Sequence, residues 1–493
     1  MNRDSNRDMS YDAVLSRKGE IIKASAGLDF ARFETGALSF DYEGLLGSAG
    51  YDLDAVRAVQ REVSVGDTPI IELRNLTALA RAYAPSGKGA RIFIKDEAAN
   101  PSGSFKDRRA SMAAYQAKKA GYKGVIAATS GNFGAAVASQ AAARGLKCII
   151  VQECYDSRMV GQPEIIEKAR KCEAFGAEVV QTSVGPELFY QSLRLLEETG
   201  FFSASLYSPF GILGMETLGH ELATQMMERT GKFPDAVVCT HAGGGNVTGT
   251  ARGLAKAGCS AALIGASVNL AGLHMASDAA FNRKSFTTGH TGFGVPFATW
   301  PDRSDVPRSA ARPLRYLDRY VTVSQGEVFY MTELLASLEG LERGPAGNTS
   351  LAAAFVLAQS MDADQTIIAQ ETEYTGAGKH VQPQLSFAID NGIELVFGDP
   401  ADEIPGKNIV LPEAPGKMRV SEVDLDRLRR SLVTTAVKGC DKEIGEADIA
   451  FLREETRLGA DAIRGIISDI SNASHGGAMH GGTIHGDSTG GEK

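Results

Sequence analysis

One lysine of this sequence has the surroundings of a chemically active amine. Lys106 lies in NPSGSFKDRR (Asn100 to Arg109), which follows the strand-like run IFIKDE and begins an alanine-rich helical pattern. A residue at such a junction lies at the edge of a sheet, where doubly wound proteins bind ligands. Lys106 is therefore a candidate to form a Schiff base with a carbonyl group. The alternative is a solvated surface charge, which is the usual state of a lysine.

Two glycine-rich segments repeat the order of strand, tight loop and helix. ATSGNFG (Ala128 to Gly134) follows the apolar run GVIAAT, and HAGGGNVTG (His241 to Gly249) follows AVVCT. Backbone N–H groups at the start of a helix bind anions. A lysine, a small polar loop and a glycine-rich cradle together predict a site for pyridoxal 5′-phosphate (PLP), because its aldehyde reacts with an amine and its phosphate needs N–H donors.

These motifs resemble the tryptophan-synthase-β-like (fold type II) family of PLP enzymes. They occur in the family's order, from GDTPIIEL (Gly66 to Leu73) through SPFGILGMETLGHEL to TGAGK (Thr375 to Lys379). The resemblance implies an α/β fold of two doubly wound domains with parallel sheets. It also implies that PLP is the cofactor and that the chain is an enzyme.

The resemblance assigns roles to the lysine and to the first loop. Lys106 would hold the cofactor as a Schiff base and then move protons as a free amine. Asn132 would contact the phenolic oxygen of the cofactor, and Thr129, Ser130 and Gly131 would hold the carboxylate of the substrate. The alternative for Ser130 or Asn132 is a plain N-cap of the following helix.

The second loop is assigned to the phosphate. Gly243, Gly244, Gly245, Asn246 and Val247 match the family's phosphate loop, and glycine lets a backbone approach an anion closely. A glycine triplet alone is weak evidence. Its place in the chain relative to the other two motifs makes the assignment specific.

Two further residues follow the strand-like IIAQETEY. Thr375 matches the hydroxyl residue that the family places against the pyridine nitrogen, and its alternative is a turn residue. A hydroxyl stabilises a protonated pyridine less than an aspartate would, so chemistry at the β-carbon is favoured over racemisation. His380 is a candidate base for ionising a thiol, with a structural or surface histidine as the alternative.

Four stretches carry a narrower resemblance, to the large subunits of amino-oxopentanoate thiolases: AGLHMASD, TTGHTGFGVPFATWPDRSDVPR, LEGLERGPAGNTS and AQETEYTGAGKH. This resemblance implies cleavage of 2-amino-4-oxopentanoate with coenzyme A (CoA) to alanine and acetyl-CoA, in ornithine degradation. It also implies a small α subunit as partner, around a homodimeric core. The alternatives are an ammonia-lyase or threonine-synthase-like lyase on the same fold, and a catalytically idle PLP-binding scaffold subunit.

The hydrophobic pattern predicts several structural units. Strand and helix patterns alternate from Arg91 (RIFIKD, GVIAAT, KCIIVQE, AEVVQT), and a second alternating block with AVVCT, AALIGAS, RYVTVS, TIIAQET and IELVF predicts a larger sheet. We expect an N-terminal extension (1–60), a larger PLP-binding domain (61–95 and 219–400), a smaller domain with the lysine (96–218) and a C-terminal helical extension (401–472). Residues 473–493 read as a flexible Gly/His-rich tail, with adventitious metal binding as the alternative.

Composition excludes several classes of protein. The formal net charge is −9 over 493 residues, which argues against nucleic-acid and anionic-membrane partners because both need a basic surface. The first residues lack an apolar signal segment and no run reaches the length of a membrane span, so we expect a cytoplasmic protein. Six cysteines without C-x-x-C spacing predict neither disulfides nor a metal site. Cys148 and Cys239 read as buried strand residues, whereas Cys154 follows a strand at its ligand-facing end.

Overall fold

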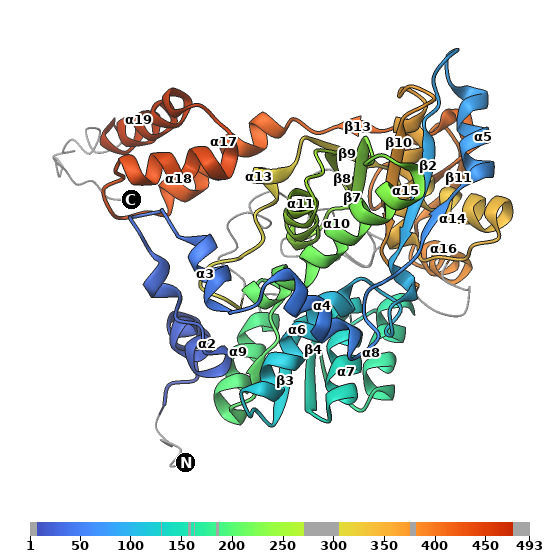
Figure 1. Cartoon of the computed structure of the whole chain (residues 1–493). Coiled ribbons are helices and arrows are strands. Elements are labelled where there is room, and N and C mark those ends of the chain that lie inside the picture. Colours follow the sequence, from blue (N-terminus) through green and yellow to red (C-terminus); the bar gives the residue numbers. More distant parts are fainter. Residues whose placement is uncertain are drawn as a thin grey trace, which may run out of the picture.

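The computed structural model describes residues 7–129, 131–155, 159–161, 163–183, 187–270, 305–374 and 381–476. Figure 1 shows two α/β units, one above the other, and a group of helices beside them. The fold is α/β with parallel sheets, as the sequence predicts. The residue limits of the domains remain a prediction.

The smaller sheet has four parallel strands in the order β5-β4-β3-β6. Its strands are β3 (Gly124–Thr129), β4 (Lys147–Tyr155), β5 (Glu178–Ser183) and β6 (Phe202–Ser203). Its helices are α6 (Lys106–Lys119), α7 (Asn132–Arg144), α8 (Pro163–Ala174) and α9 (Glu187–Thr199). Strand β3 is buried along its whole length, which explains its unbroken apolar sequence.

The larger sheet has seven strands in the order β1-β2-β10-β7-β8-β9-β13. The five central strands run parallel: β2 (Arg91–Asp96), β7 (Ala236–Thr240), β8 (Ala262–Val268), β9 (Arg319–Val323) and β10 (Thr366–Glu371). The edge strands β1 (Ile70–Glu72) and β13 (Ser421–Glu422) are antiparallel to their neighbours. The strand RIFIKD therefore joins this sheet by pairing with β10, although it alternates in sequence with strands of the smaller one.

Helices cover both faces of the larger sheet (Figure 1). They are α5 (Arg74–Tyr83), α14 (Gln325–Glu339) and α15 (Pro345–Ala358) on one apolar cluster, and α10 (Pro209–Thr230) and α11 (Gly245–Lys256) on another. Successive strand residues alternate between the clusters: Ile92 and Ile94 belong to the first, and Phe93 belongs to the second. This alternation is the two-residue period of a strand buried on both faces.

The predicted strand IELVF does not extend the larger sheet, so the sequence interpretation was wrong on this point. Strand β11 (Glu394–Gly398) pairs with β12 (Asn408–Pro412) in a separate two-stranded sheet. The reason is a local apolar cluster that joins these strands to α14 and to α16 (Val381–Asp390). An apolar pattern predicts that a segment forms a strand, but it does not predict which other strand that segment pairs with.

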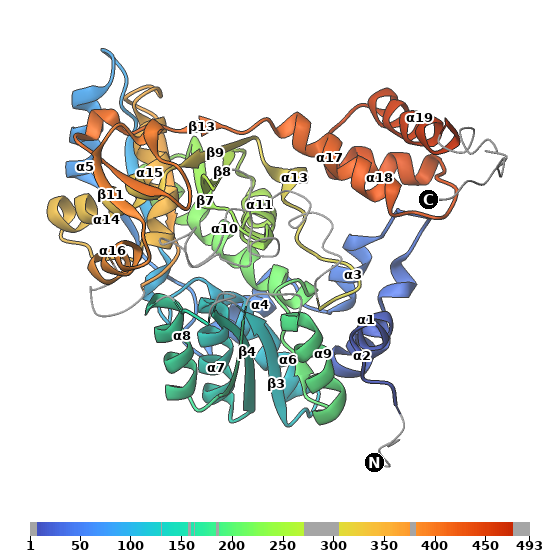
Figure 2. The ribbon, with the colours of Figure 1, turned by 180° about the vertical axis from the view of Figure 1, so that it is seen from behind.

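Helix α3 (Tyr42–Ser48), near the beginning of the chain, contacts α18 (Glu446–Thr456) near its end, since the rings of Tyr42 and Phe451 stack with their centroids 6.2 Å apart. Helix α18 forms one group with α17 (Leu425–Lys438) and α19 (Ala460–Gly476) (Figure 1, Figure 2). The other N-terminal helices lie elsewhere: α1 (Tyr11–Ser16) and α2 (Lys18–Ala26) contact α9, and α4 (Leu53–Arg61) contacts α6 and α10. Asp448 on α18 accepts hydrogen bonds from the backbone N–H groups of Leu38 and Ser39, at 2.7 and 2.8 Å. The N-terminal extension is thus tied to the C-terminal helices.

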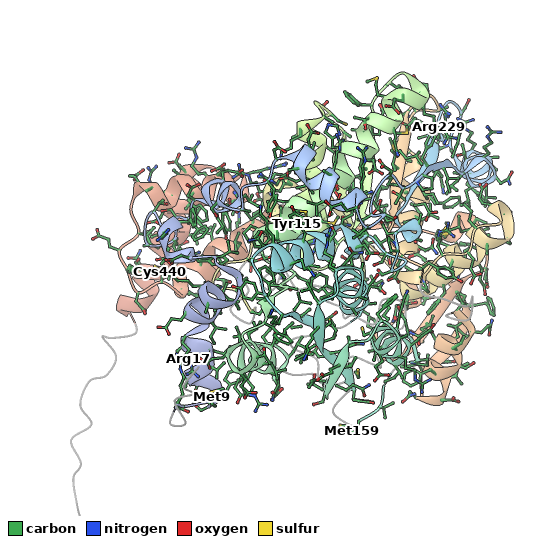
Figure 3. All side chains as sticks on the ribbon, turned by 60° about the horizontal axis from the view of Figure 1, so that its bottom comes forward. Met9, Arg17, Tyr115, Met159, Arg229 and Cys440 are labelled. Carbon is green, nitrogen blue, oxygen red and sulfur yellow. The ribbon has the colours of Figure 1, made fainter. Side chains whose placement is uncertain are left out.

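The beginning of the chain is also tied to the smaller unit. Arg17 forms an ion pair with Glu197 on α9, with 2.8 Å between Nη2 and Oε2. Tyr190 donates a hydrogen bond to the carbonyl oxygen of Met9. Figure 3 shows Met9 and Arg17 at the same edge of the molecule. In the described part of the chain, none of the helices combines the length and the apolarity needed to cross a bilayer.

Candidate active site

Lys106 is the first residue of α6, and a backbone hydrogen bond holds the preceding loop to the larger sheet. Phe105 N donates to Thr372 O beyond the end of β10, at 3.0 Å. The Lys106 ammonium lies 4.6 Å from the centre of the Phe105 ring. Burial lowers the pKa of Lys106 well below its usual value, and the nearby charge of Arg109 lowers it further. A neutral amine is the form that attacks a carbonyl group.

The first glycine-rich loop connects β3 to α7 and is organised by one hydroxyl. Thr129 Oγ1 accepts hydrogen bonds from the N–H groups of Gly131 and Gly134, at 3.0 and 3.3 Å. Asn132 follows as the first residue of α7. The loop therefore places its own backbone and the Asn132 side chain at the carboxyl end of β3.

The second loop connects β7 to α11. Gly244 has a φ of +83°, which favours glycine, and a Cβ at this position would lie 2.5 Å from Cγ of Pro313. A Cβ on Gly245 would lie 2.4 Å from Nη2 of Arg109. The first N–H groups of α11 have no acceptor within the helix. An anion can therefore approach the backbone of this loop closely and accept hydrogen bonds from its N–H groups.

These elements meet in one cavity at the carboxyl ends of β3, β7 and β10. It is lined by the following predicted residues: Lys106, Thr129, Gly131, Asn132, Gly243, Gly244, Gly245 and Asn246. Val247 is an exception, because its side chain is fully buried in the apolar cluster between α11 and the larger sheet. Only its backbone remains available for the predicted role. Ser130, Thr375 and His380 lie outside the described residues, and their roles remain predictions.

Four further ionisable side chains of the cavity were not identified from the sequence: Arg109, Lys168, Tyr207 and Glu373. Two of them lie within or near the sequence motifs of the site, since Arg109 ends SFKDRR and Glu373 lies two residues before TGAGK. The sequence could have indicated these two residues, because each is a charged residue at the end of a strand or the start of a helix, and these positions lie at the ligand-binding edge. Lys168, on α8, carried no comparable signal.

Glu373 and Lys168 form a buried charged group with Glu164. Lys168 Nζ donates to Glu164 Oε1 at 2.5 Å and lies 3.8 Å from Glu373 Oε2. Burial raises the pKa of Glu373 to about 7, against the opposing effect of the Lys168 charge. Glu373 Oε1 is buried without a hydrogen-bond partner among the described residues. A carboxyl group in this state can take up or release a proton near neutral pH.

Cys154 does not line the cavity. Its side chain is fully buried against Ile165 and Ala169 of α8. Burial raises the pKa of its thiol to about 12, so the reactive thiolate is suppressed at neutral pH. Cys148 and Cys239 are buried strand residues, as the sequence predicts.

The cavity fits PLP on the observations above. The Lys106 amine, with its lowered pKa, suits the aldehyde. The glycine loop, where a Cβ on Gly244 or Gly245 would collide with its neighbours, suits a phosphate bound by backbone N–H groups. Asn132 lines the same cavity and can donate to an oxygen of the ring.

Comparisons with known proteins agree with this fit. The family model described as "Pyridoxal-phosphate dependent enzyme" matches residues 62–372. The chain is 66% identical to the 2-amino-4-ketopentanoate thiolase beta subunit of Acetoanaerobium sticklandii, over 94% of this chain and 99% of that protein. A second protein of the same name, from an unknown prokaryotic organism, is 63% identical over the same shares. The solved structure of a threonine deaminase from T.th. is 25% identical, with a TM-score of 0.50, and the match covers 66% of this chain and 99% of that one.

Proposed function

Because the chain belongs to the family of pyridoxal-phosphate dependent enzymes, we propose that it cleaves 2-amino-4-oxopentanoate with CoA. The products are alanine and acetyl-CoA, and the reaction is a step in ornithine degradation. The catalytic unit includes a small partner subunit, in keeping with the words "beta subunit" in the names of its relatives.

One observation carries the proposal. The chain is 66% identical, over 94% of its length, to a protein named for thiolysis of this substrate. The identity extends far beyond the PLP motifs, which other members of the family share. The cavity supports the proposal because it combines an amine with a lowered pKa, N–H donors and a titratable carboxyl group.

Bound PLP supplies an electron sink that is conjugated with the carbons of the substrate. In the proposed reaction, Lys106 holds the cofactor and takes a proton from the substrate's α-carbon. Burial lowers the pKa of Lys106, which favours the unprotonated Nζ that can accept this proton. The loop from Thr129 to Asn132 orients the amino acid, with backbone donors for its carboxylate.

Thiolysis also needs a base for the CoA thiol and a proton for the carbon that departs from the carbonyl group. Glu373 is the described residue best suited to both steps, because its pKa of about 7 lets it accept a proton and return it. It lines the same cavity as Lys106. His380 remains the second candidate for the base.

The buried position of Cys154 favours direct attack by CoA on the ketone. An acyl-cysteine step would need a thiolate in the cavity, and this thiol lies outside it with a raised pKa. The proposed reaction therefore proceeds without an acetyl group on the protein.

The test is acetyl-CoA formation. The purified chain, with and without the small subunit, is given 2-amino-4-oxopentanoate and CoA, and acetyl-CoA and alanine are measured. We expect both products in equal amounts, with the full rate only in the two-subunit complex. Absence of acetyl-CoA from a PLP-loaded complex overturns the proposal.

A second candidate is amino-acid deamination, because a threonine deaminase structure covers two thirds of this chain. The same assay without CoA distinguishes the two functions. Rapid ammonia release from serine, threonine or diaminopropionate, with no acetyl-CoA from the oxo acid, would favour the deaminase.

A further inference from the structure

Arg109 is a buried cation in the cavity without a counter-ion among the described residues. It lies one helical turn after Lys106 on α6, and its relative exposure is 4%. Its Nε is fully buried without an acceptor, and no described carboxylate forms an ion pair with its guanidinium. Burial lowers the pKa of Arg109 to about 10, although the neighbouring Tyr207 acts in the opposite direction. An unpaired buried charge is costly, so its presence beside an open cavity indicates an anionic ligand.

The position of the guanidinium indicates where that anion binds. A Cβ on Gly245 would lie 2.4 Å from Arg109 Nη2, so the guanidinium lies against the first turn of α11. The start of a helix carries a partial positive charge, and a cation placed there is repelled. An anion between the two removes this conflict, because both the helix N–H groups and the arginine donate to it.

We propose that Arg109 is the side-chain counter-ion of the cofactor phosphate and completes the site formed by the loop from Gly243 to Gly245. The phosphate then accepts hydrogen bonds from backbone groups on α11 and from a guanidinium on α6. The two helices belong to different sheets, so the phosphate also joins the two α/β units. This inference goes beyond the proposed function, because it stands whether or not acetyl-CoA is formed.

Other phosphates could use the same chemistry, and CoA carries several. The cofactor phosphate is favoured because Arg109 and Lys106 share one helix and face one cavity with the glycine loop. That arrangement places an amine for the aldehyde and a cation for the phosphate within the reach of one small molecule.

The experiment compares PLP with pyridoxal, which lacks the phosphate, on the full-length apoprotein. We expect Arg109→Met to weaken PLP binding by about 10- to 100-fold, the effect of losing a charge-assisted contact. Pyridoxal binding should change less than about threefold. Arg109→Lys, which keeps the charge, should recover part of the affinity and serves if the methionine variant fails to fold.

The unfolding temperature should respond to Arg109→Met differently in the apoprotein and in the presence of phosphate. Apo Arg109→Met should unfold at the same or a higher temperature than the apo parent, since an unpaired buried charge has been removed. Inorganic phosphate should stabilise the parent apoprotein but not this variant. Arg229→Met is the control, since Arg229 lies at a distant edge of the molecule (Figure 3), where it donates to Ile70 O and lies over the Phe93 ring.

Two outcomes would overturn the assignment. One is equal weakening of PLP and pyridoxal binding in Arg109→Met, which would indicate a structural role. The other is unchanged PLP affinity with weaker CoA binding, which would move the arginine to the second substrate. Neither outcome affects the acetyl-CoA test of the proposed function.

Discussion

Two neighbouring arginines of α6 differ completely in their surroundings. Arg108 is fully buried in a network with Glu97 and Glu221, with 2.7 Å from Nε to Glu97 Oε2 and 3.1 Å from Nη1 to Glu221 Oε2. Burial acts to lower its pKa, but the two carboxylates outweigh burial and raise it. Arg109 is also buried, but no carboxylate of the described residues pairs with it, and burial lowers its pKa.

The difference distinguishes the network around Arg108, which supports the fold, from the cavity beside Arg109, which is suited to binding and catalysis. In the network around Arg108 every charge is matched, and Lys95 and Thr68 complete it by bonding to Glu221 and Glu97. In the cavity, burial shifts the pKa values of Lys106, Arg109 and Glu373 towards the neutral form of each side chain. Groups with such shifted pKa values beside an open cavity are typical of functional sites.

The largest effect is expected at Lys106. Lys106→Ala should reduce turnover by about 10³-fold or more, because it removes both the attachment of the cofactor and the proton carrier. Borohydride reduction of the PLP-loaded parent, followed by peptide mapping, should mark Lys106. A mark on another lysine would contradict the assignment of the site.

Substitution in the balanced network should affect stability instead. Arg108→Met should lower the free energy of unfolding by about 3–5 kcal/mol, because Glu97 is left buried without its cation and Glu221 keeps only Lys95. Urea denaturation measures the change. Arg61→Met is the control, since its ion pair with Asp67 is solvent-exposed and should contribute little. Unchanged stability of Arg108→Met would remove the contrast between the two arginines.

Glu373→Gln should change the pH dependence of turnover. A base with a raised pKa of about 7 is deprotonated above that pH, so the parent's rate should rise between about pH 6 and 8. In the variant this rise should disappear, with a loss of about 10²-fold at pH 8. Glu403→Gln is a matched control. Burial also raises the pKa of Glu403 to about 7, but its carboxylate accepts from Gln325 and Gly326 at the start of α14.

The rise with pH remaining intact in Glu373→Gln would exclude this carboxyl group as the base. His380 would then be the next residue to replace. If the Glu403 variant alone lost the rise, the pH dependence would report on folding rather than on the reaction.

The smallest effect is expected at Cys154. Cys154→Ala should keep most of the activity and cost about 1 kcal/mol of stability, because a small buried side chain is shortened in an apolar cluster. Turnover and thermal unfolding measure both quantities. Loss of turnover with PLP still bound, together with an acetylated Cys154 trapped in the parent, would refute direct attack by CoA.

Gly244 is a poor place to test phosphate binding, although its loop is central to the site. Its backbone is left-handed, and Pro313 leaves no room for a Cβ. Gly244→Val would therefore disturb the fold as well as the loop. Gly243→Ala is preferable, since the three atoms nearest to its Cβ would all belong to the Tyr207 side chain, with Oη at 3.3 Å.

The sequence by itself predicted residues that line one cavity and the type of most elements around it. Lys106, Asn132 and the loop from Gly243 to Gly245 could be predicted because motifs at strand-to-helix junctions constrain the backbone locally. The same locality explains the predicted strands and helices, since the apolar period reflects which faces of an element are buried.

Only the tertiary structure decided which strands pair and which charges stay unpaired. Strand β2 joins β10 across a long stretch of chain, and β11 joins β12 instead of the larger sheet. The sequence shows Arg108 and Arg109 as equal neighbours, because side-chain burial and counter-ions come from distant segments. Glu97 and Glu221 reach one arginine and no described carboxylate reaches the other, so their opposite pKa shifts are properties of the folded chain.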